Sequence, residues 1–315
     1  MQDQILQALH AGQSARALAL AQDWVAQAPE QVSPWHWLGL ACDAAGQTGA
    51  AVTAWTCAQQ RLAAQGRAPL PPQSAAVQDW PAMAERAPDA RRVVLVWGAP
   101  GSAVDRLAAV MEPVRDHFSA DRFGDTPPDD GFQDPALVAG LANGALDPAQ
   151  VAARWWATLP SRGLVEGTVA DWLPWWDNVL LHVLRPHLPE ATLVIALRDP
   201  RDMLLDWLAY GAAAAFAPGS PQAAADWLAI CLGQVVTLGE EQLFPHRILR
   251  TDAIGHDPAA ATAQINQLFN TGLAAPAHLG PPRLPAGHWR QYADMLAEPF
   301  ATLAPVAMRL GYPAD

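Results

Sequence analysis

The sequence predicts an α/β protein, with a parallel sheet covered by helices on both faces and a small all-helical domain before it. From about residue 91 onward, short apolar runs alternate with helical patterns, and this alternation is typical of βαβ units. The first sixty-odd residues instead have helical periodicity alone. With 315 residues, 51% of them hydrophobic, the chain is long enough to fill one large core and one small one.

The N-terminal segment, residues 1–67, contains a repeat. Large and small residues recur in its second half at Trp35, Leu38, Gly39, Gly46, Ala51, Trp55 and Ala58. One period of about 34 residues earlier, the corresponding places hold Gly12, Ala17 and Pro29. The pattern resembles two tetratricopeptide repeats, the first one degraded; a helical hairpin without repeat character is the alternative. We expect Ala51 to let paired helices approach while Trp35 and Trp55 fill the gap between them.

Residues 68–90 are rich in proline and alanine, which predicts a linker to the domain at 91–315. Four apolar runs predict the strands of that domain: RRVVLVWG (91–98), GLVEGTVAD (163–171), TLVIALRDPRD (192–202) and HRILRTD (246–252). Helices are predicted from about Ser102 to Phe118, after Pro174, and over residues 257–270. Ligands of parallel sheets bind at the carboxyl ends of the strands. The loops after these runs are therefore the candidate site.

Charge narrows the possible chemistry. The net charge of −12 argues against nucleic acid or an anionic membrane as a partner. All 19 basic residues are arginine, so the chain has no lysine for a Schiff base, for general base catalysis or for a nucleotide-binding P-loop. An anion site must use arginine, histidine, backbone amides or helix ends.

Several other classes are not expected. No apolar stretch has the roughly 18 to 20 residues of a membrane span, and MQDQILQALHAG does not have the pattern of a signal peptide. We therefore expect a soluble cytoplasmic protein. The three cysteines are assigned to packing, and the nine histidines have no metal-ligand spacing, so no metal site is predicted.

The first motif that can carry chemistry is VVLVWGAPGSAVDRLAAVM, which starts at Val93. A strand ending in Gly98, a turn with Pro100 and Gly101, and a helix opening at Ser102 would point backbone amides at a phosphate. Ser102 and Asp105 also stand in the register of a capping box, which would place a carboxylate on those same amides.

The second motif is RDPRD at residues 198–202. Asp199 is suited to cap a helix, Pro200 to its first position and Asp202 to a capping box, so these three residues are explained by helix initiation alone. Arg198 is not, because it ends an apolar strand, where an unpaired charge is costly to bury. We therefore expect Arg198 to bind an anion, either a carboxylate or a ligand.

The third motif is GHWRQY…LGYP near the C-terminus, in which Trp289 and Arg290 open a predicted amphipathic helix. Considered alone, this segment predicts only a surface helix with a stacked tryptophan.

Together, in this order, the three motifs resemble the sulfotransferase family over about residues 92–315, in particular bacterial proteins that fuse tetratricopeptide repeats to a sulfotransferase domain. The resemblance implies a P-loop-like parallel sheet flanked by helices. It also implies the donor 3′-phosphoadenosine 5′-phosphosulfate and transfer of its sulfuryl group to a hydroxyl or amine. By this resemblance, the nucleotide-binding residues are Gly98, Pro100, Gly101, Ser102 and Ala103 at the 5′-phosphosulfate, Arg198 at the 3′-phosphate, Asp206 at a serine position, and Trp289 and Arg290 over the nucleotide.

The chain departs from the family pattern at the positions that should contact the donor. Gly101, Val104 and Asp105 stand where the family has a basic residue and two threonines. Asp206 replaces the serine, and Trp172 replaces a lysine near the reacting oxygens. A tryptophan neither stabilises the developing negative charge nor accepts a proton. An arginine from elsewhere can supply the missing cation, and the candidates are Arg106, Arg154, Arg162, Arg283 and Arg290.

Three interpretations stay open at this point. The chain is an active sulfotransferase, or an inactive one that binds a protein or peptide partner through its helical repeats, or a protein rebuilt for an uncharged or cationic ligand. No catalytic residue is assigned, although Glu166, His182 and His187 are candidate bases. The zone of Trp155, Trp156, Trp172, Trp175 and Trp176 is either an aromatic platform or helix packing.

Overall fold

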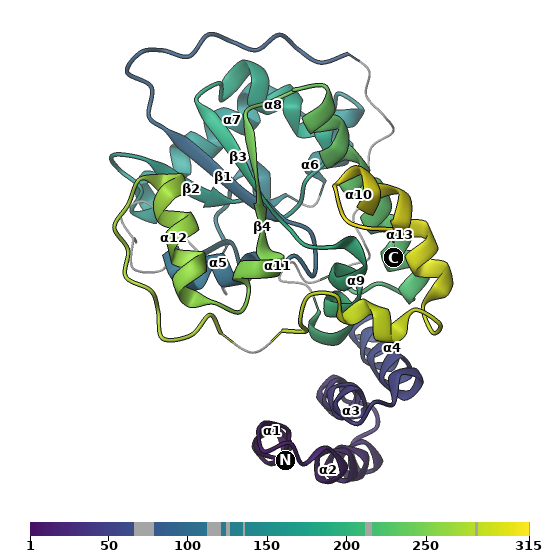
Figure 1. Ribbon diagram of the computed structural model, residues 1–315. Coiled ribbons are helices and arrows are strands. Elements are labelled where there is room, and N and C mark those ends of the chain that lie inside the picture. Colours follow the sequence, from purple (N-terminus) through teal and green to yellow (C-terminus); the bar gives the residue numbers. More distant parts are fainter. Residues whose placement is uncertain are drawn as a thin grey trace. The chain divides into compact units, whose positions relative to one another are not determined.

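The computed structural model describes residues 1–65, 79–111, 121–123, 127–134, 136–211, 216–280 and 283–314. Residues 66–78 of the predicted linker lie outside these ranges, as does the end of the helix predicted to reach Phe118. The fold is α/β, with a four-stranded parallel sheet flanked by helices (Figure 1). This part of the prediction is confirmed.

The chain divides into two compact units that interleave in sequence. Unit 1 comprises Met1–Leu70, Asp199–Ala229 and Leu284–Asp315, and unit 2 comprises Pro71–Arg198 and Ile230–Arg283. The predicted boundaries at residues 67 and 91 therefore mark changes in amino-acid composition and pattern. They do not delimit unit 1, which also contains two later segments of the chain.

Unit 1 is helical. Its elements are α1 (Gln2–His10), α2 (Ser14–Gln27), α3 (Val32–Ala44), α4 (Thr48–Ala64), α9 (Pro200–Tyr210), the first half of α10 (Pro221–Glu240), the 3₁₀ helix η5 (His288–Tyr292) and α13 (Ala297–Arg309). The predicted C-terminal helix is thus two elements, separated by residues 293–296, and Trp289 lies in the 3₁₀ helix.

Helices α1 to α4 form two consecutive hairpins, and α3 packs along α4. Ala51 and Trp55 are fully buried, as predicted, and an added Cβ on Gly39 would lie 2.1 Å from the indole nitrogen of Trp55. The prediction that Trp35 fills the gap between the helices is wrong. Trp35 is only partly buried, and the guanidinium of Arg61 lies 4.5 Å from its ring.

The later segments of unit 1 join the hairpins through specific polar contacts. The hydroxyl of Tyr292 donates to Asp43 at 2.6 Å, and the Tyr292 ring lies 5.8 Å from that of Trp55. The side-chain amide of Gln59 donates to the carbonyl of Leu208 at 3.3 Å. Helices α3 and α4 therefore pack against α9 and η5, which explains why contiguous sequence domains do not match the compact units.

Unit 2 contains the sheet. Its strands are β1 (Val93–Gly98), β2 (Val169–Trp172), β3 (Ala191–Leu197) and β4 (His246–Arg250), in the order β2-β1-β3-β4. Its helices are α5 (Val104–Met111), α6 (Leu137–Ala142), α7 (Pro148–Thr158), α8 (Leu181–His187), α11 (Thr251–Ile254), α12 (Pro258–Phe269) and the second half of α10, with 3₁₀ helices η1 (Asp121–Phe123), η2 (Gly131–Gln133), η3 (Pro160–Arg162) and η4 (Asn178–Leu180).

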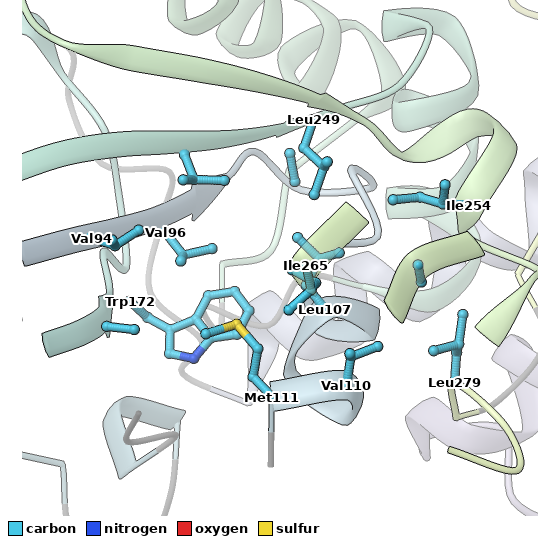
Figure 2. Close-up of a cluster of buried hydrophobic side chains, with 14 residues drawn as sticks. Val94, Val96, Leu107, Val110, Met111, Trp172, Leu249, Ile254, Ile265 and Leu279 are labelled. Carbon is cyan, nitrogen blue, oxygen red and sulfur yellow. The ribbon is translucent and has the colours of Figure 1, made fainter. Parts of the chain in front are cut away.

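Alternation along the strands divides the side chains of the sheet between two faces. On one face, Val94, Val96 and Trp172 pack with Leu107 of α5 and Ile265 of α12 (Figure 2). On the other, the rings of Trp97 and Trp176 lie 6.5 Å apart. Strands that are apolar on both faces are typical of a sheet covered on both sides, so the continuous apolar runs predicted them correctly.

Strand β2 is shorter than predicted. It begins at Val169, because Gly163 and Gly167 have positive φ and the segment between them turns instead of extending. Glu166 is exposed on this turn, not on a strand. Within the described part of the chain, no helix has the length and apolar character needed to cross a membrane.

We predict that Gly39→Ala destabilises the chain by about 2 kcal/mol, because the new methyl group overlaps the buried Trp55 ring. The matched control is Gly233→Ala in α10, where nothing lies within 4 Å of an added Cβ and a small gain in helix stability is expected. Urea unfolding of both variants measures the difference. Equal unfolding midpoints would contradict the packing of α3 on α4.

Candidate functional site

The candidate site is centred on the loop after β1. Strand β1 lies between β2 and β3, and residues Val93 to Gly98 pair with Ala191 to Ala196. The chain leaves β1 for β2 on one side and later returns to β3 on the other, which makes the carboxyl end of β1 a topological switch point. The first and third predicted strands therefore lie side by side in the sheet.

Gly98 allows the loop to fold back onto the strand end. A Cβ at this position would lie 2.3 Å from Oγ of Ser102, 2.7 Å from Cβ of Val104 and 3.1 Å from Cβ of Ala196. No larger residue fits without moving the loop. The glycine of the motif is therefore explained by close packing of the loop on β1 and β3.

The loop has an unusual backbone. Gly101 and Ala103 have φ of 78° and 59°, and the left-handed region is uncommon for alanine. The N–H of Ser102 donates to the carbonyl of Ala99, and α5 begins at Val104. The prediction that the helix opens at Ser102 is wrong, because the left-handed Ala103 interrupts it.

The predicted capping box is also wrong. Oγ of Ser102 is buried and has no hydrogen-bond partner among the described residues, and the carboxylate of Asp105 reaches Arg283 at 2.6 Å. Asp105 therefore does not occupy the loop amides. The first N–H groups of an α-helix have no acceptor within the helix. At the start of α5, this applies to the N–H groups of Val104 and Asp105.

Thr251, which the sequence reasoning missed, joins the loop to β3. Its hydroxyl donates a hydrogen bond that is shared between two carbonyl oxygens, that of Ser102 at 2.6 Å and that of Leu197 at 3.2 Å. Arg198 directly follows Leu197 and is 2% exposed. The structure thus brings Ser102 and the start of the RDPRD motif together. The only signal in the sequence was the place of Thr251 at the end of a predicted strand.

Two of the candidate cations lie at α5: Arg106 is a buried residue of that helix, and Arg283 reaches its first turn through an ion pair. Its guanidinium pairs with Asp105 in the first turn of α5, and its side chain is 18% exposed. Arg154 instead pairs with Asp129 on the surface, and Arg162 pairs with Asp121 and Asp171. Of these three arginines, Arg283 is the one that pairs with α5, the helix that follows the candidate loop.

The remaining predicted site residues belong to unit 1. Asp199 caps α9 by accepting from the N–H of Arg201 at 2.9 Å, as predicted, and Pro200 occupies the first helical position. Asp202 accepts from the backbone N–H groups of Gly287 at 2.5 Å and Trp289 at 2.9 Å. The sequence did not predict these bonds, which tie the second motif to the third.

The ring of Trp289 is packed against arginine. The guanidinium of Arg201 lies 3.7 Å from its centre and that of Arg290 4.8 Å, distances typical of cation–π contacts. Asp206 is fully buried and accepts from the N–H of Leu284 at 3.1 Å. Nucleotide-binding roles for Asp206, Trp289 and Arg290 stay predictions.

A buried cluster of charges holds the end of β2, and the sequence did not predict it. Asp171 is fully buried and accepts from both Arg122 and Arg162, each through two nitrogen atoms, and from the indole N–H of Trp155 at 2.8 Å. Arg122 also pairs with Asp130 at 2.7 Å. Burial alone would raise the pKa of Asp171, but the two arginines outweigh burial and lower it to about 2.

Trp172, which the predicted resemblance aligns with a lysine, lies in the hydrophobic core. It is 2% exposed and packs with Met111, Val94 and Val96 (Figure 2). Trp155 and Trp176 are likewise buried. Of the two interpretations of the tryptophan zone, packing is therefore confirmed for these three residues, and an aromatic platform is not.

Neither a family model nor a curated protein matches the chain. The resemblance to sulfotransferases therefore rests on the three motifs alone. Across the described ranges, no group of three or more His, Cys, Asp or Glu side chains is arranged to hold a metal ion.

We predict that Asp171→Asn destabilises the chain by about 3 kcal/mol or more, because it leaves two buried arginines short of one negative charge. The control is Asp129→Asn, whose ion pair with Arg154 is exposed and is expected to contribute less than about 1 kcal/mol. Denaturant unfolding at pH 7 measures both.

The pH dependence gives a second test of the same cluster. Because the folded pKa of Asp171 is lowered from 3.8 to about 2, its contribution is present above pH 4 and is lost as the pH falls through 2. The wild type should therefore lose more stability than Asp171→Asn between pH 4 and 2. Parallel losses would contradict the assigned charges.

Proposed function

We propose that the chain is a sulfotransferase-like protein with tetratricopeptide-like N-terminal repeats, and that it binds 3′-phosphoadenosine 5′-phosphosulfate at the carboxyl ends of β1 and β3. The observation that carries this proposal is the Ser102 hydroxyl, which is fully buried in the loop after β1 without a partner among the described residues. A buried hydroxyl without a hydrogen bond costs free energy, and a ligand that accepts its proton is one explanation for such a group.

The loop offers the kinds of group that a phosphosulfate needs. The N–H groups in the first turn of α5 and the positive end of its dipole favour an anion. Ser102 would add a hydroxyl donor once its side chain turns away from Gly98, since it is buried in its present position. Arg198, buried at the end of β3, would hold the 3′-phosphate.

Arg283 would supply the cation that the loop itself lacks. It reaches the first turn of α5 through its ion pair with Asp105. An incoming phosphosulfate would compete with Asp105 for the guanidinium. The structure thus fits the donor in part, with Asp105 as an internal competitor.

In the proposed reaction, the acceptor oxygen or nitrogen bonds to sulfur, the bond from sulfur to the bridging oxygen of the phosphosulfate breaks, and the acceptor loses a proton. The products are the sulfated acceptor and adenosine 3′,5′-bisphosphate. We assign no general base. Glu166 is exposed on the turn before β2, and among the described residues no hydrogen bond, ion pair or ring contact joins His182 or His187 to the loop.

One observation favours the alternative, a catalytically inactive sulfotransferase-like protein that serves as a protein-interaction scaffold. The lysine position near the reacting oxygens is filled by Trp172, which is committed to the core. In that case the chain binds a protein or peptide partner through its helical repeats. It either retains nucleotide binding without transfer or has lost both.

We predict that adenosine 3′,5′-bisphosphate raises the melting temperature of the chain, and that Ser102→Ala weakens this binding about tenfold. A ligand at one hundred times its dissociation constant stabilises the folded state by about 2.7 kcal/mol. The Ser102 hydroxyl makes no hydrogen bond to a described residue, so its removal should leave the fold intact. Ser161→Ala, on an exposed serine, is the control. An unchanged melting curve at millimolar nucleotide would refute the donor site.

We also predict that Asp105→Asn tightens bisphosphate binding by about three- to tenfold. The substitution releases Arg283 from its ion pair and removes a negative charge near the loop, and a unit charge 4 Å away contributes about 1 kcal/mol even in water. Isothermal titration calorimetry measures the change. Arg283→Ala should weaken binding, and a loss of affinity in Asp105→Asn would show that the carboxylate itself helps to position the ligand.

A further inference from the structure

Strand β4 forms one edge of the sheet (Figure 1). It pairs with β3 and with no other strand among the described residues. Ile248, in the middle of the strand, is 41% exposed. An exposed strand edge carries unpaired backbone groups and can accept a further strand.

The direction of the free backbone groups follows from the pairing. The N–H of Leu193 donates to the carbonyl of Pro245. In a parallel ladder, alternate residues direct their backbone groups to the same neighbour, so Arg247 and Leu249 face β3 while His246, Ile248 and Arg250 face the open edge. The N–H and carbonyl of Ile248 are thus placed at the centre of that edge.

A groove runs beside this edge. It has a volume of about 350 Å³ and lies between β4 and α12, lined by Arg247, Ile248, Leu249, Val194, Gln264, Gln267 and Leu268. Leu249 packs with Ile265 of α12 in the core, so Arg247, two residues before it, shares the face that α12 covers. An added strand would direct every second side chain into this groove.

The lining is apolar apart from one basic and two amide side chains, in a chain of net charge −12. It contains Arg247 and two glutamines but no acidic residue, and Arg247 makes no ion pair with a described residue. From the outward backbone, the adjoining groove and this charge, we propose that β4 binds an extended acidic segment of a partner protein, which adds to the sheet as a further strand by β-augmentation.

The proposed strand has a defined pattern. Acidic side chains at alternate positions would reach Arg247, Gln264 and Gln267 in the groove, and the intervening apolar side chains would lie beside Ile248 on the other face. Arginine on an edge also discourages pairing between strands. That protective role alone would not produce a preference for one peptide charge over the other.

The test uses the full chain and two fluorescein-labelled hexapeptides, (Glu-Val)₃ and (Lys-Val)₃, with affinities measured by fluorescence anisotropy. The wild type should bind (Glu-Val)₃ at least tenfold more tightly than (Lys-Val)₃. Arg247→Glu should reverse this preference. Arg16→Glu, which makes the same charge change on an exposed helix, is the control and should leave the preference unchanged.

A second variant tests the backbone. Ile248→Pro removes an N–H that faces the open edge and should weaken (Glu-Val)₃ binding at least tenfold, with circular dichroism melting as the check on folding. Equal binding of the two peptides, no binding below 1 mM, or the same effect from Arg247→Glu and Arg16→Glu would overturn the proposal. Self-association of the chain that Arg247→Glu abolishes would identify a second copy as the occupant and overturn it as well.

Discussion

The hydroxyl of Thr251 and the missing side chain of Gly98 together fix the geometry on which the candidate site depends. Gly98 lets the loop return to within contact of β1 and β3, and Thr251 then ties the loop carbonyl of Ser102 to the carbonyl of Leu197. Three segments distant in sequence are held at one point. This constraint holds the loop that contains Ala103 in its uncommon left-handed conformation.

The absence of lysine shapes the rest of the molecule. Several arginines form fixed pairs with carboxylates: Arg122 and Arg162 with Asp171, Arg201 with Asp199, and Arg283 with Asp105. Arginine suits such sites because its planar fork binds a carboxylate through two nitrogen atoms. The positive charge of these four arginines is therefore already balanced within the fold. An incoming anion at the loop must compete with a carboxylate, whereas one at β4 finds Arg247 without an ion pair to a described residue.

Local patterns predicted the sheet well, because β1 and β3 are apolar on both faces and so appear as continuous runs. They also predicted the cap by Asp199, which depends only on neighbouring residues. They failed where the outcome depends on distant contacts. The start of α5 at Val104 depends on packing around Gly98. The role of Thr251 depends on the adjacency of β3 and β4. The composition of unit 1 depends on contacts of Tyr292 and Gln59 with segments far away in sequence. The Asp171 cluster assembles four separated segments, which single-sequence periodicity does not reveal.

The end of β2 argues for separating ligand binding from group transfer. Asp171 and Trp172 are adjacent, yet alternation places them on opposite faces, one in a charge cluster and the other in the apolar core. Both side chains are therefore committed to stability, and neither is available to stabilise charge on a reacting oxygen. The loop after β1 has no such commitment, since its serine hydroxyl has no partner among the described residues. Under the proposed function, this distribution would leave the loop after β1 to bind the donor, while neither side chain at the end of β2 would support transfer.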